Sequence, residues 1–266
     1  MIILKRLGVK TLIATSHTTA DVYSSLKLVR LVERHITKVF TCVTCSAEES
    51  FFGNSNLYSD NIRLKRHNHV TIYNCLPPSA EFGWNENRNS LTIGVVSRLV
   101  AIKGMDLVMP AFAELKSKIP NAKLIIVGDG ELRETMETQQ RELGLEESVE
   151  WTGLVEKEQL GVYYDKMDVV WVPSRSEGFG LTALEAMEHG CVVVAANVGG
   201  LKEVVEDEKS GIFFESGNKS DLAQKSIALL QNKDIFAKLS KTAVERAKQF
   251  SFEEYTKAIL GLYAKL

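Results

Sequence analysis

A regular series of short apolar runs between residues 91 and 197 constrains the fold more than any other feature of the sequence. The runs are LTIGVVS, KLIIVGD, SVEWTG, DVVWVPS and CVVVAAN. Such runs, rich in β-branched residues, are typical of strands covered on both faces. Stretches with helical character lie between them, for example at residues 105–119, 131–144 and 181–190. This alternation with short connections predicts an α/β fold with a doubly wound parallel sheet.

The part of the chain before residue 91 shows a less complete version of the same pattern. The runs TLIATSH, VFTCVT and HVTIYNC predict three strands, and a helical stretch, YSSLKLVRLVERHITK, separates the first two. NCLPPSAEFGWNENRN then breaks all periodicity, as expected of a linker. We therefore predict a partial N-terminal domain at residues 1–76, a linker at 77–90, a C-terminal domain at 91–250 and a final helix at 251–266.

Charge and cysteine usage argue against several classes of protein. A formal net charge of -2 offers no electrostatic reason for a nucleic-acid partner. The opening MIILKRLG has too short an apolar run for a signal peptide or a membrane-spanning helix. Cys42 and Cys45 form a CxxC without a second pair, so we interpret them as buried strand thiols in preference to a zinc or redox site. This cysteine usage predicts a reducing, cytoplasmic setting.

One basic cluster, RLKRHNH at residues 63–69, departs from this balance. A solvated loop is its simplest interpretation, and a contact with phosphate or a membrane surface is the alternative. His67 and His69 would share a strand face, but no carboxylate or cysteine joins them in the sequence. We therefore predict no metal site there.

The loops that follow the predicted strands contain the residues best suited to bind a ligand, because ligands of doubly wound sheets bind beyond the carboxyl ends of the strands. Arg98 and Lys103 follow the first strand of the C-terminal domain, and two cations there suit a diphosphate. A helix predicted to begin near Phe179 would offer free N–H groups to an anion. Gly178 and Gly180 would permit close approach of the backbone to a ligand.

Nucleotide-binding and metal-binding motifs of other families are missing. Arg133 stands where the third glycine of GxGxxG would be, and the sequence has neither GxxxxGK[ST] nor Asp-x-Asp. We therefore expect no metal and no cofactor, and a leaving group stabilised by arginine and lysine. Glu177 and Glu185 could accept hydrogen bonds from sugar hydroxyls. The alternative is that one acid near the helix N-terminus only interacts favourably with the helix dipole and that the other is solvated.

Together these stretches resemble the retaining glycosyltransferases of the GT-B fold, in the large family 4 (group 1). The residues that match are SRLVAIKG, IIVGDGELRE, VEWTGLV, VVWVPSRSEGFGLTALEAMEHG and VGGLKEVVEDEKSGIFF, in the family's order. ATSHTT, CSAEES and VTIYNC extend the resemblance weakly upstream, toward enzymes of exopolysaccharide and capsule assembly. The resemblance implies a complete C-terminal Rossmann-like domain and a truncated N-terminal Rossmann-like domain.

The family's functional residues can be carried over by position. Arg98 and Lys103 match the pair that holds the donor diphosphate and stabilises it as the leaving group. Glu177 and Glu185 match the E-x7-E acids that contact the donor sugar and the ribose. His17 matches a histidine that lies against the donor sugar, although a structural role is the alternative. The turn of Gly153, Leu154 and Val155 matches the base pocket, and Phe179, Gly180 and Leu181 match backbone contacts to sugar and phosphate. Further donor-binding positions are Gly128 and Gly178.

The resemblance implies a retaining hexosyltransferase that moves a sugar from a nucleotide-diphosphate donor to a saccharide or lipid-linked acceptor in cell-surface polysaccharide synthesis. It also allows peripheral association with the inner face of a membrane. The alternatives are a nucleotide-sugar-binding module without turnover, or a remnant that needs a partner chain. A nucleotide-sugar epimerase is a weaker third hypothesis, because such enzymes do not usually carry SEGFGLTALE.

Three departures from the family pattern affect these expectations. Ser97 replaces a glycine and Cys191 replaces a proline, and a full acceptor domain would extend well before Met1. We expect an open sheet edge in the N-terminal part, and self-association through exposed apolar surface there. In the family the final helix braces that domain, so Tyr255, Ile259, Leu262 and Tyr263 should be buried, after an N-cap at Ser251.

Overall fold

The computed structural model describes residues 8–20, 23–64, 68–78, 82–83 and 91–266. The chain divides into two compact units. Unit 1 comprises Met1–Pro78, Glu177–Gly180 and Phe250–Leu266. Unit 2 comprises Ser79–Ser176 and Leu181–Gln249. The short segment Glu177–Gly180 thus groups with unit 1, although its neighbours in the chain belong to unit 2.

Unit 2 is built on a six-stranded parallel sheet with the strand order β6-β5-β4-β7-β8-β9. Its strands are β4 (Thr92–Val96), β5 (Lys123–Val127), β6 (Val149–Gly153), β7 (Val169–Val172), β8 (Val192–Ala196) and β9 (Gly211–Phe214). Numbered within the unit, this order is 3-2-1-4-5-6, the arrangement of a Rossmann-like sheet. The predicted doubly wound α/β fold is therefore confirmed.

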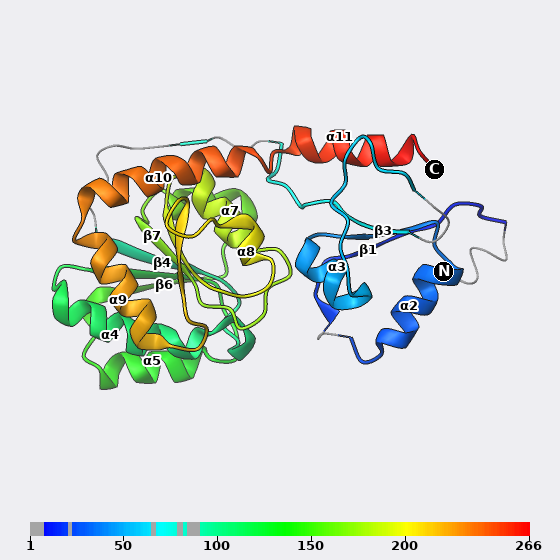
Figure 1. Ribbon diagram of the computed structural model, residues 1–266. Helices are drawn as coiled ribbons and strands as arrows, with labels where there is room; N and C mark the ends of the chain where they lie inside the picture. Colours follow the sequence, from blue (N-terminus) through cyan, green and yellow to red (C-terminus); the bar gives the residue numbers. More distant parts are fainter. Residues whose placement is uncertain (1–7, 21–22, 65–67, 79–81, 84–90) are drawn as a thin grey trace. The chain divides into compact units, whose positions relative to one another are not determined.

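Helices cover both faces of this sheet, with α4, α5 and α9 on one side and α7 and α10 on the other (Figure 1). They are α4 (Val108–Lys118), α5 (Arg133–Glu142), α6 (Leu160–Tyr164), α7 (Leu181–Glu188), α8 (Leu201–Val204), α9 (Lys219–Leu230) and α10 (Lys233–Lys248). Short 3-10 turns are η2 (Ala101–Lys103), η3 (Met105–Leu107), η4 (Glu146–Ser148) and η5 (Lys157–Gln159). Strand β9 and helices α8 to α10 lie in a region for which no elements were predicted.

A large apolar cluster packs one face of the unit 2 sheet against α4, α5 and α9. Phe112 of α4 and Trp171 of β7 are almost fully buried in it. The indole nitrogen of Trp171 donates a hydrogen bond to the hydroxyl of Ser226 on α9 (2.8 Å), so its one polar atom is satisfied inside the core. Burying one large apolar side chain stabilises a fold by about 1.5–3 kcal/mol, and this core has many of them.

Unit 1 contains a smaller parallel sheet with the order β1-β2-β3. Its elements are β1 (Ile13–Ser16), α2 (Leu26–His35), β2 (Val39–Cys42), α3 (Cys45–Phe52), β3 (Asn68–Thr71) and α11 (Phe252–Tyr263). Two separate apolar clusters flank the central strand β2, one including Phe40 and Phe51 and the other Val39 and Leu262. Within the described residues β1 pairs with β2 alone, so this sheet has the open edge that the sequence predicted.

Helix α11 packs within unit 1 through one apolar face. Its N-cap is Ser251, whose hydroxyl accepts a hydrogen bond from the backbone N–H of Glu254 (3.3 Å). Leu262 is fully buried, and Tyr255 and Ile259 pack against the same cluster. The prediction for Tyr263 was wrong, because its side chain is 53% exposed. Residues 255, 259 and 262 lie along one stripe of the helix, and the next residue turns away toward solvent.

A buried carboxylate in unit 1 contradicts the expectation that no acid joins the predicted histidine pair. Glu48 of α3 is fully buried and accepts hydrogen bonds from His69, the Thr71 hydroxyl and the Asn56 backbone N–H (3.0 Å for the last). The packing of α3 beside β3 brings this acid to His69, and no local sequence pattern could indicate it. His67 and most of the predicted linker lie outside the described residues.

The two cysteines of CVTC differ in environment. Cys42 ends β2 and is buried, and burial raises the pKa of its thiol far above the ordinary value, with Glu48 and Cys45 adding to the rise. Cys45 begins α3 and is only half-buried, so it is not the strand thiol that we predicted. Within the described residues neither cysteine forms a disulfide.

Candidate functional site

The order of strands in unit 2 reverses direction between β4 and β7. In doubly wound sheets ligands bind at such a switch point, in the crevice beyond the carboxyl ends of the strands. The loop with Arg98 and Lys103 follows β4, and the chain from β7 leads through the SEGFG turn into α7. The side chain of Thr182, at the start of α7, donates to the carbonyl of Val96 at the end of β4 (3.4 Å). Loop and helix therefore meet at this edge of the sheet.

The loops after β4, β5 and β6 form one hydrogen-bonded rim. Leu99 N–H donates to the carbonyl of Asp129 (2.9 Å), and Gly128 N–H donates to the carbonyl of Gly153 (2.8 Å). These contacts fix the three loops relative to one another. A ligand at the rim would therefore meet an organised backbone.

Arg98 is exposed, and Lys103 is half-buried at the end of η2. Arg175 holds this loop from the other strand of the switch point. Its guanidinium donates to the carbonyl of Ala101 (2.6 Å) and to both carboxylate oxygens of Asp106 (2.6 and 2.7 Å). The hydrogen bond from Arg175 lowers the pKa of Asp106, although partial burial opposes it. Sequence reasoning missed Arg175, which is adjacent in sequence to the SEGFG motif.

Gly128 has a backbone reason to be glycine. Its φ is 126°, and a Cβ atom there would lie 1.9 Å from the carbonyl oxygen of Ser97. The close packing of the β4 and β5 loops therefore requires glycine whether or not a ligand binds.

The turn after β6 combines a left-handed glycine with an exposed apolar residue. Gly153 has a φ of 70°, and the side chain of Leu154 is 81% exposed. Nearby, the guanidinium of Arg133 lies over the ring of Trp151, 5.3 Å from its centroid. Arg133, which stands in place of the third glycine of GxGxxG, therefore packs near this turn. An apolar surface beside an arginine is compatible with the predicted base pocket, whose third residue is Val155.

Glu185 lies in the second turn of α7 and is half-buried. Its Oε2 accepts a hydrogen bond from the hydroxyl of Tyr164 (2.9 Å). Burial raises the pKa of Glu185 above the ordinary value, and the hydrogen bond from Tyr164 partly offsets this. Sequence reasoning did not single out Tyr164.

Unit 1 holds the turn Glu177–Gly180 through its backbone. The hydroxyl of Thr44 donates to the carbonyl of Gly178 (2.9 Å). A Cβ atom on Gly178 would lie 2.5 Å from the carbonyl oxygen of His17. This glycine was predicted to admit a ligand, but its close neighbour is the protein backbone. His17 and Gly178 are thus brought together through main-chain atoms.

The same turn is anchored by an aromatic cluster. Phe179 is buried, and its ring lies edge-on to that of Phe250 with centroids 5.7 Å apart. Tyr73 contacts both rings, at 6.2 Å from Phe179 and 5.5 Å from Phe250. Phe179 therefore has a clear packing role beside any role in ligand binding.

The predicted site residues are divided between the units. Unit 2 contains Arg98, Lys103, Gly128, Gly153, Leu154, Val155, Leu181 and Glu185. Unit 1 contains His17, Glu177, Gly178, Phe179 and Gly180.

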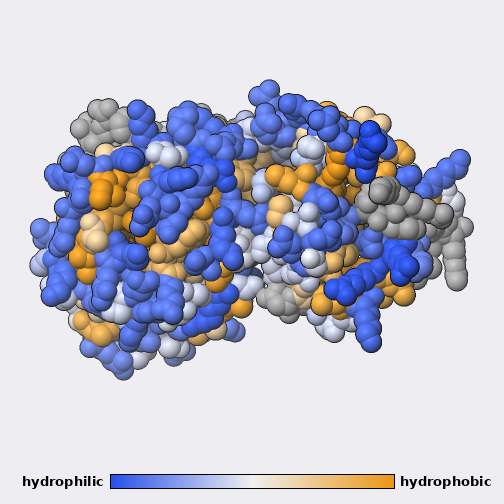
Figure 2. Space-filling model, viewed as in Figure 1, coloured by the Kyte–Doolittle hydropathy of each residue, from blue (hydrophilic) through white to orange (hydrophobic). Residues whose placement is uncertain are grey.

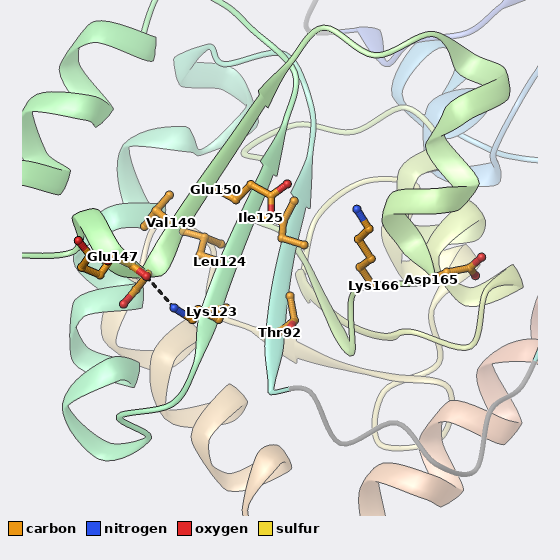
Figure 3. Close-up of a pocket in the computed structure, with 10 residues that line it drawn as sticks. Thr92, Lys123, Leu124, Ile125, Glu147, Val149, Glu150, Asp165 and Lys166 are labelled. Carbon is orange, nitrogen blue, oxygen red and sulfur yellow. Dashed lines mark hydrogen bonds between the residues drawn. The ribbon is translucent and has the colours of Figure 1, made fainter.

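A hollow of about 590 Å³ lies at the opposite, amino-terminal end of the strands (Figure 3). Thr92 and Lys123, which begin β4 and β5, line it together with Asp165 and Lys166. The ammonium group of Lys123 donates to the carbonyl of Glu147 (2.6 Å). None of the predicted site residues lines this hollow.

Neither a metal-binding cluster nor a membrane-spanning helix is found among the residues that the structure describes. These residues contain no group of three or more histidine, cysteine, aspartate or glutamate side chains placed to hold a metal ion. They also contain no helix that is both long and apolar enough to cross a membrane.

Comparison with known protein families shows the family to which this chain belongs. The family model described as "Glycosyl transferases group 1" matches residues 78–250. The chain belongs to the group 1 glycosyltransferases. The matched region coincides with the sheet, its rim and the E-x7-E segment.

Curated relatives of this group 1 glycosyltransferase are considerably longer. The D-inositol 3-phosphate glycosyltransferase of Corynebacterium aurimucosum is 34% identical over 65% of this chain and 42% of its own length. An uncharacterised glycosyltransferase of Methanocaldococcus jannaschii is 32% identical over 74% of this chain and 54% of its own length. The chain thus spans about half the length of the curated relatives it matches.

Solved structures confirm the GT-B-like fold class. HepE of Anabaena, crystallised in complex with UDP and glucose, matches with a TM-score of 0.83 at 22% identity, over 99% of this chain and 74% of that one. Sucrose-phosphate synthase from Thermosynechococcus elongatus matches with a TM-score of 0.80 at 22% identity, over 99% and 70% of the two chains. These likenesses show the fold.

One departure from the group 1 pattern has a structural explanation. Cys191 stands where the family usually has proline, and it is fully buried after α7. Its thiol donates to the carbonyls of Tyr164 and Met167 (both 3.2 Å). The cysteine therefore ties the end of α7 to the segment that precedes β7.

Proposed function

We propose that this chain binds a nucleotide-diphosphate sugar and transfers the sugar, with retention of configuration, to a saccharide or lipid-linked acceptor in cell-surface polysaccharide synthesis. The observation that carries the proposal is the organised rim at the switch point between β4 and β7, where the strand that leads to Arg98 and Lys103 contacts the start of the helix with Glu185. HepE structures with UDP and with UDP-glucose support a donor of this class.

In the proposed reaction Arg98 and Lys103 bind the diphosphate of the donor. As the bond between the anomeric carbon and the phosphate oxygen breaks, negative charge grows on the leaving group, and the two cations stabilise it. The acceptor hydroxyl forms the new bond from the same face, and its proton leaves with the nucleoside diphosphate. No metal ion or cofactor takes part in this scheme.

The remaining residues orient the donor. Glu177 accepts hydrogen bonds from the sugar, and Glu185 accepts from the ribose. The backbone of residues 179–181 contacts sugar and phosphate, and the turn at 153–155 contacts the base. His17 lies against the donor sugar from the acceptor side.

The diphosphate role of the two cations can be tested by calorimetry with UDP and with uridine, or with the ADP or GDP pair if that binds more tightly. Arg98→Ala and Lys103→Ala should each weaken the nucleoside diphosphate about 10–100-fold, since a hydrogen bond to a charged group is worth about 1.5–3 kcal/mol. The affinity of these variants for the nucleoside should change little. Lys123→Ala, at the other end of the same sheet, is the matched control. Equal losses for both ligands would assign the two cations to folding.

Turnover separates an enzyme from a binding module. Donor consumption, measured with and without candidate acceptors, should persist in EDTA. Binding without consumption in every case would favour the non-catalytic alternative. A strict need for Mg²⁺ or Mn²⁺ would contradict the metal-free scheme.

We also propose that the chain acts at the cytoplasmic face of a membrane as a peripheral protein. Leu28 and Leu31 of α2 are 62% and 49% exposed, and Lys27 and Arg34 lie on the same helix. The face shown in Figure 2 has hydrophobic patches among hydrophilic residues on both units. Co-sedimentation with phosphatidylglycerol vesicles should fall for the Leu28→Ser, Leu31→Ser double variant. Light scattering of the same samples tests the predicted self-association, which would instead use these leucines between copies.

A further inference from the structure

The contact between Tyr164 and Glu185 joins two elements of unit 2 at the candidate site. Tyr164 ends α6 and is 1% exposed, and its hydroxyl donates to Oε2 of Glu185 (2.9 Å). Burial raises the pKa of Tyr164 well above the ordinary value, and the negative charge of Glu185 raises it further. The hydroxyl therefore stays protonated and serves as a permanent donor. Within the part of the chain that the structure describes, no hydrogen bond to Oε1 of Glu185 is seen.

The structure also fixes the tyrosine itself. Its ring stacks on His189, with centroids 5.5 Å apart and an interplanar angle of 23°. His189 in turn donates from Nδ1 to the carboxylate of Asp165 (2.8 Å). The thiol of Cys191 donates to the backbone carbonyl of Tyr164 (3.2 Å). Ring and main chain are thus both held, so the hydroxyl has a defined position.

Glutamate has three rotatable side-chain bonds, and a flexible carboxylate is a poor partner for a single ligand hydroxyl. A buried donor that holds one oxygen leaves the other oxygen in a fixed direction. His189 directly follows α7, and its backbone N–H donates to the carbonyl of Glu185 (3.3 Å), so its ring lies one turn after the acid.

We infer that Tyr164 is a positioning residue for ligand recognition by Glu185: it holds Oε2 so that Oε1 is presented to a ribose hydroxyl of the nucleotide. This inference rests on the proposed function, in which Glu185 contacts the ribose. It assigns ribose selectivity to a residue outside the E-x7-E motif. Tyr164 itself touches no substrate.

The test compares nucleotides with and without a ribose hydroxyl. Calorimetry would use UDP, 2′-deoxy-UDP and 3′-deoxy-UDP, or the corresponding ADP or GDP series if that binds the natural chain more tightly. The natural chain should prefer the full ribose about 10-fold or more over one deoxy form, as for loss of a hydrogen bond to a charged group. Tyr164→Phe should reduce this preference to about 3-fold or less and leave affinity for the deoxy form nearly unchanged.

Two further variants serve as controls for this result. Glu185→Gln should lose the preference as Tyr164→Phe does. Tyr163→Phe removes the hydroxyl of the neighbouring, half-buried tyrosine and should behave like the natural chain. If Tyr164→Phe weakens the full and deoxy nucleotides equally, or keeps the natural preference, the inference is overturned.

A ligand-free measurement separates this inference from the proposed function. Carbon-detected NMR of the Glu185 carboxyl should show a higher pKa in Tyr164→Phe than in the natural chain, because burial remains and the opposing hydrogen bond is gone. Tyr163→Phe should not shift it. A raised pKa together with no ribose preference in the natural chain would overturn the ribose assignment of Glu185 and leave the contact established. An unchanged pKa would overturn the contact itself.

Discussion

Unit 2 and unit 1 are both parallel α/β structures, but their sheets are covered to different extents. In unit 2, helices cover both faces of a six-stranded sheet, and the apolar cluster on one of these faces is large. In unit 1, three strands leave β2 between two separate small clusters. Apolar burial per residue rises with the size of a domain. Unit 1, with its smaller apolar clusters, should therefore depend more on individual side chains than unit 2 does.

The units also hold their predicted functional residues in different ways. Unit 2 organises its loops by backbone hydrogen bonds along the rim, as between Gly128 and Gly153. Unit 1 holds the turn Glu177–Gly180 by the hydroxyl of Thr44 and by aromatic packing around Phe179. Side-chain changes should therefore disturb the unit 1 turn more readily than the unit 2 rim.

The largest expected effect concerns the two cores. Phe51→Ala in unit 1 and Phe112→Ala in unit 2 should each cost about 3–5 kcal/mol, because both rings are fully buried. We expect Phe51→Ala to abolish protection from hydrogen exchange across unit 1 and Phe112→Ala to leave unit 2 folded. Mass spectrometry of the exchanged peptides would measure both. Loss of protection in both units after either change would show that the two units do not differ in this way.

A glycine of the rim should show the next largest effect. Gly128→Ala should destabilise unit 2 by about 3 kcal/mol, since its Cβ would overlap the carbonyl oxygen of Ser97. Gly144→Ala is the matched control: its φ is also positive, but no atom lies within 4 Å of the added carbon. It should cost about 1–2 kcal/mol, from the left-handed backbone alone. Urea unfolding would give both free energies of unfolding. Equal losses in the two variants would show that the backbone at Ser97 can move to accommodate the added carbon.

The buried acid of unit 1 provides a smaller effect. Glu48→Ala should destabilise unit 1 by about 2 kcal/mol, because buried hydrogen-bond donors lose their acceptor. Glu49→Ala changes the neighbouring exposed acid and should stay within about 0.5 kcal/mol. Thermal unfolding followed by circular dichroism would compare them. An unchanged Glu48→Ala protein would mean that α3 is held by its apolar contacts alone.

The smallest effect is expected for the ion pair between Arg175 and Asp106, next to the loop with Arg98 and Lys103. Asp106→Asn should cost about 0.2–1 kcal/mol at pH 7, because Asp106 and Arg175 are both partly exposed. The pKa of Asp106 is lowered in the folded protein, so its contribution is complete above the unfolded pKa and is lost as the pH falls through the folded value. The difference between Asp106→Asn and the natural chain should therefore disappear in acid. A difference that is constant with pH would contradict this.

Local patterns in the sequence were sufficient for much of the fold. Strands β4, β5, β7 and β8 are apolar runs rich in β-branched residues, and such runs signal a buried strand without help from the rest of the chain. For β6 the expectation of cover on both faces was wrong, because it is an edge strand and is at most half-buried. Strand β9 has only the short run Gly211–Phe214, and no prediction was made for it. The buried residues of the apolar stripe of α11 were predicted correctly except for Tyr263. The helical period shows which face of a helix is buried, but it does not show how wide the buried face is.

What the sequence determined by itself is therefore the class of fold and the position of the candidate residues at strand ends, since both follow from periodicity within short segments. Only the tertiary structure decided which strands are neighbours, and with that the switch point between β4 and β7. It also decided that Tyr164 meets Glu185 and that Glu48 meets His69, pairs separated by 21 residues in each case. Sheet pairing and side-chain contacts join segments that are distant in the chain, and periodicity shows which face of a segment is buried but not what it is buried against.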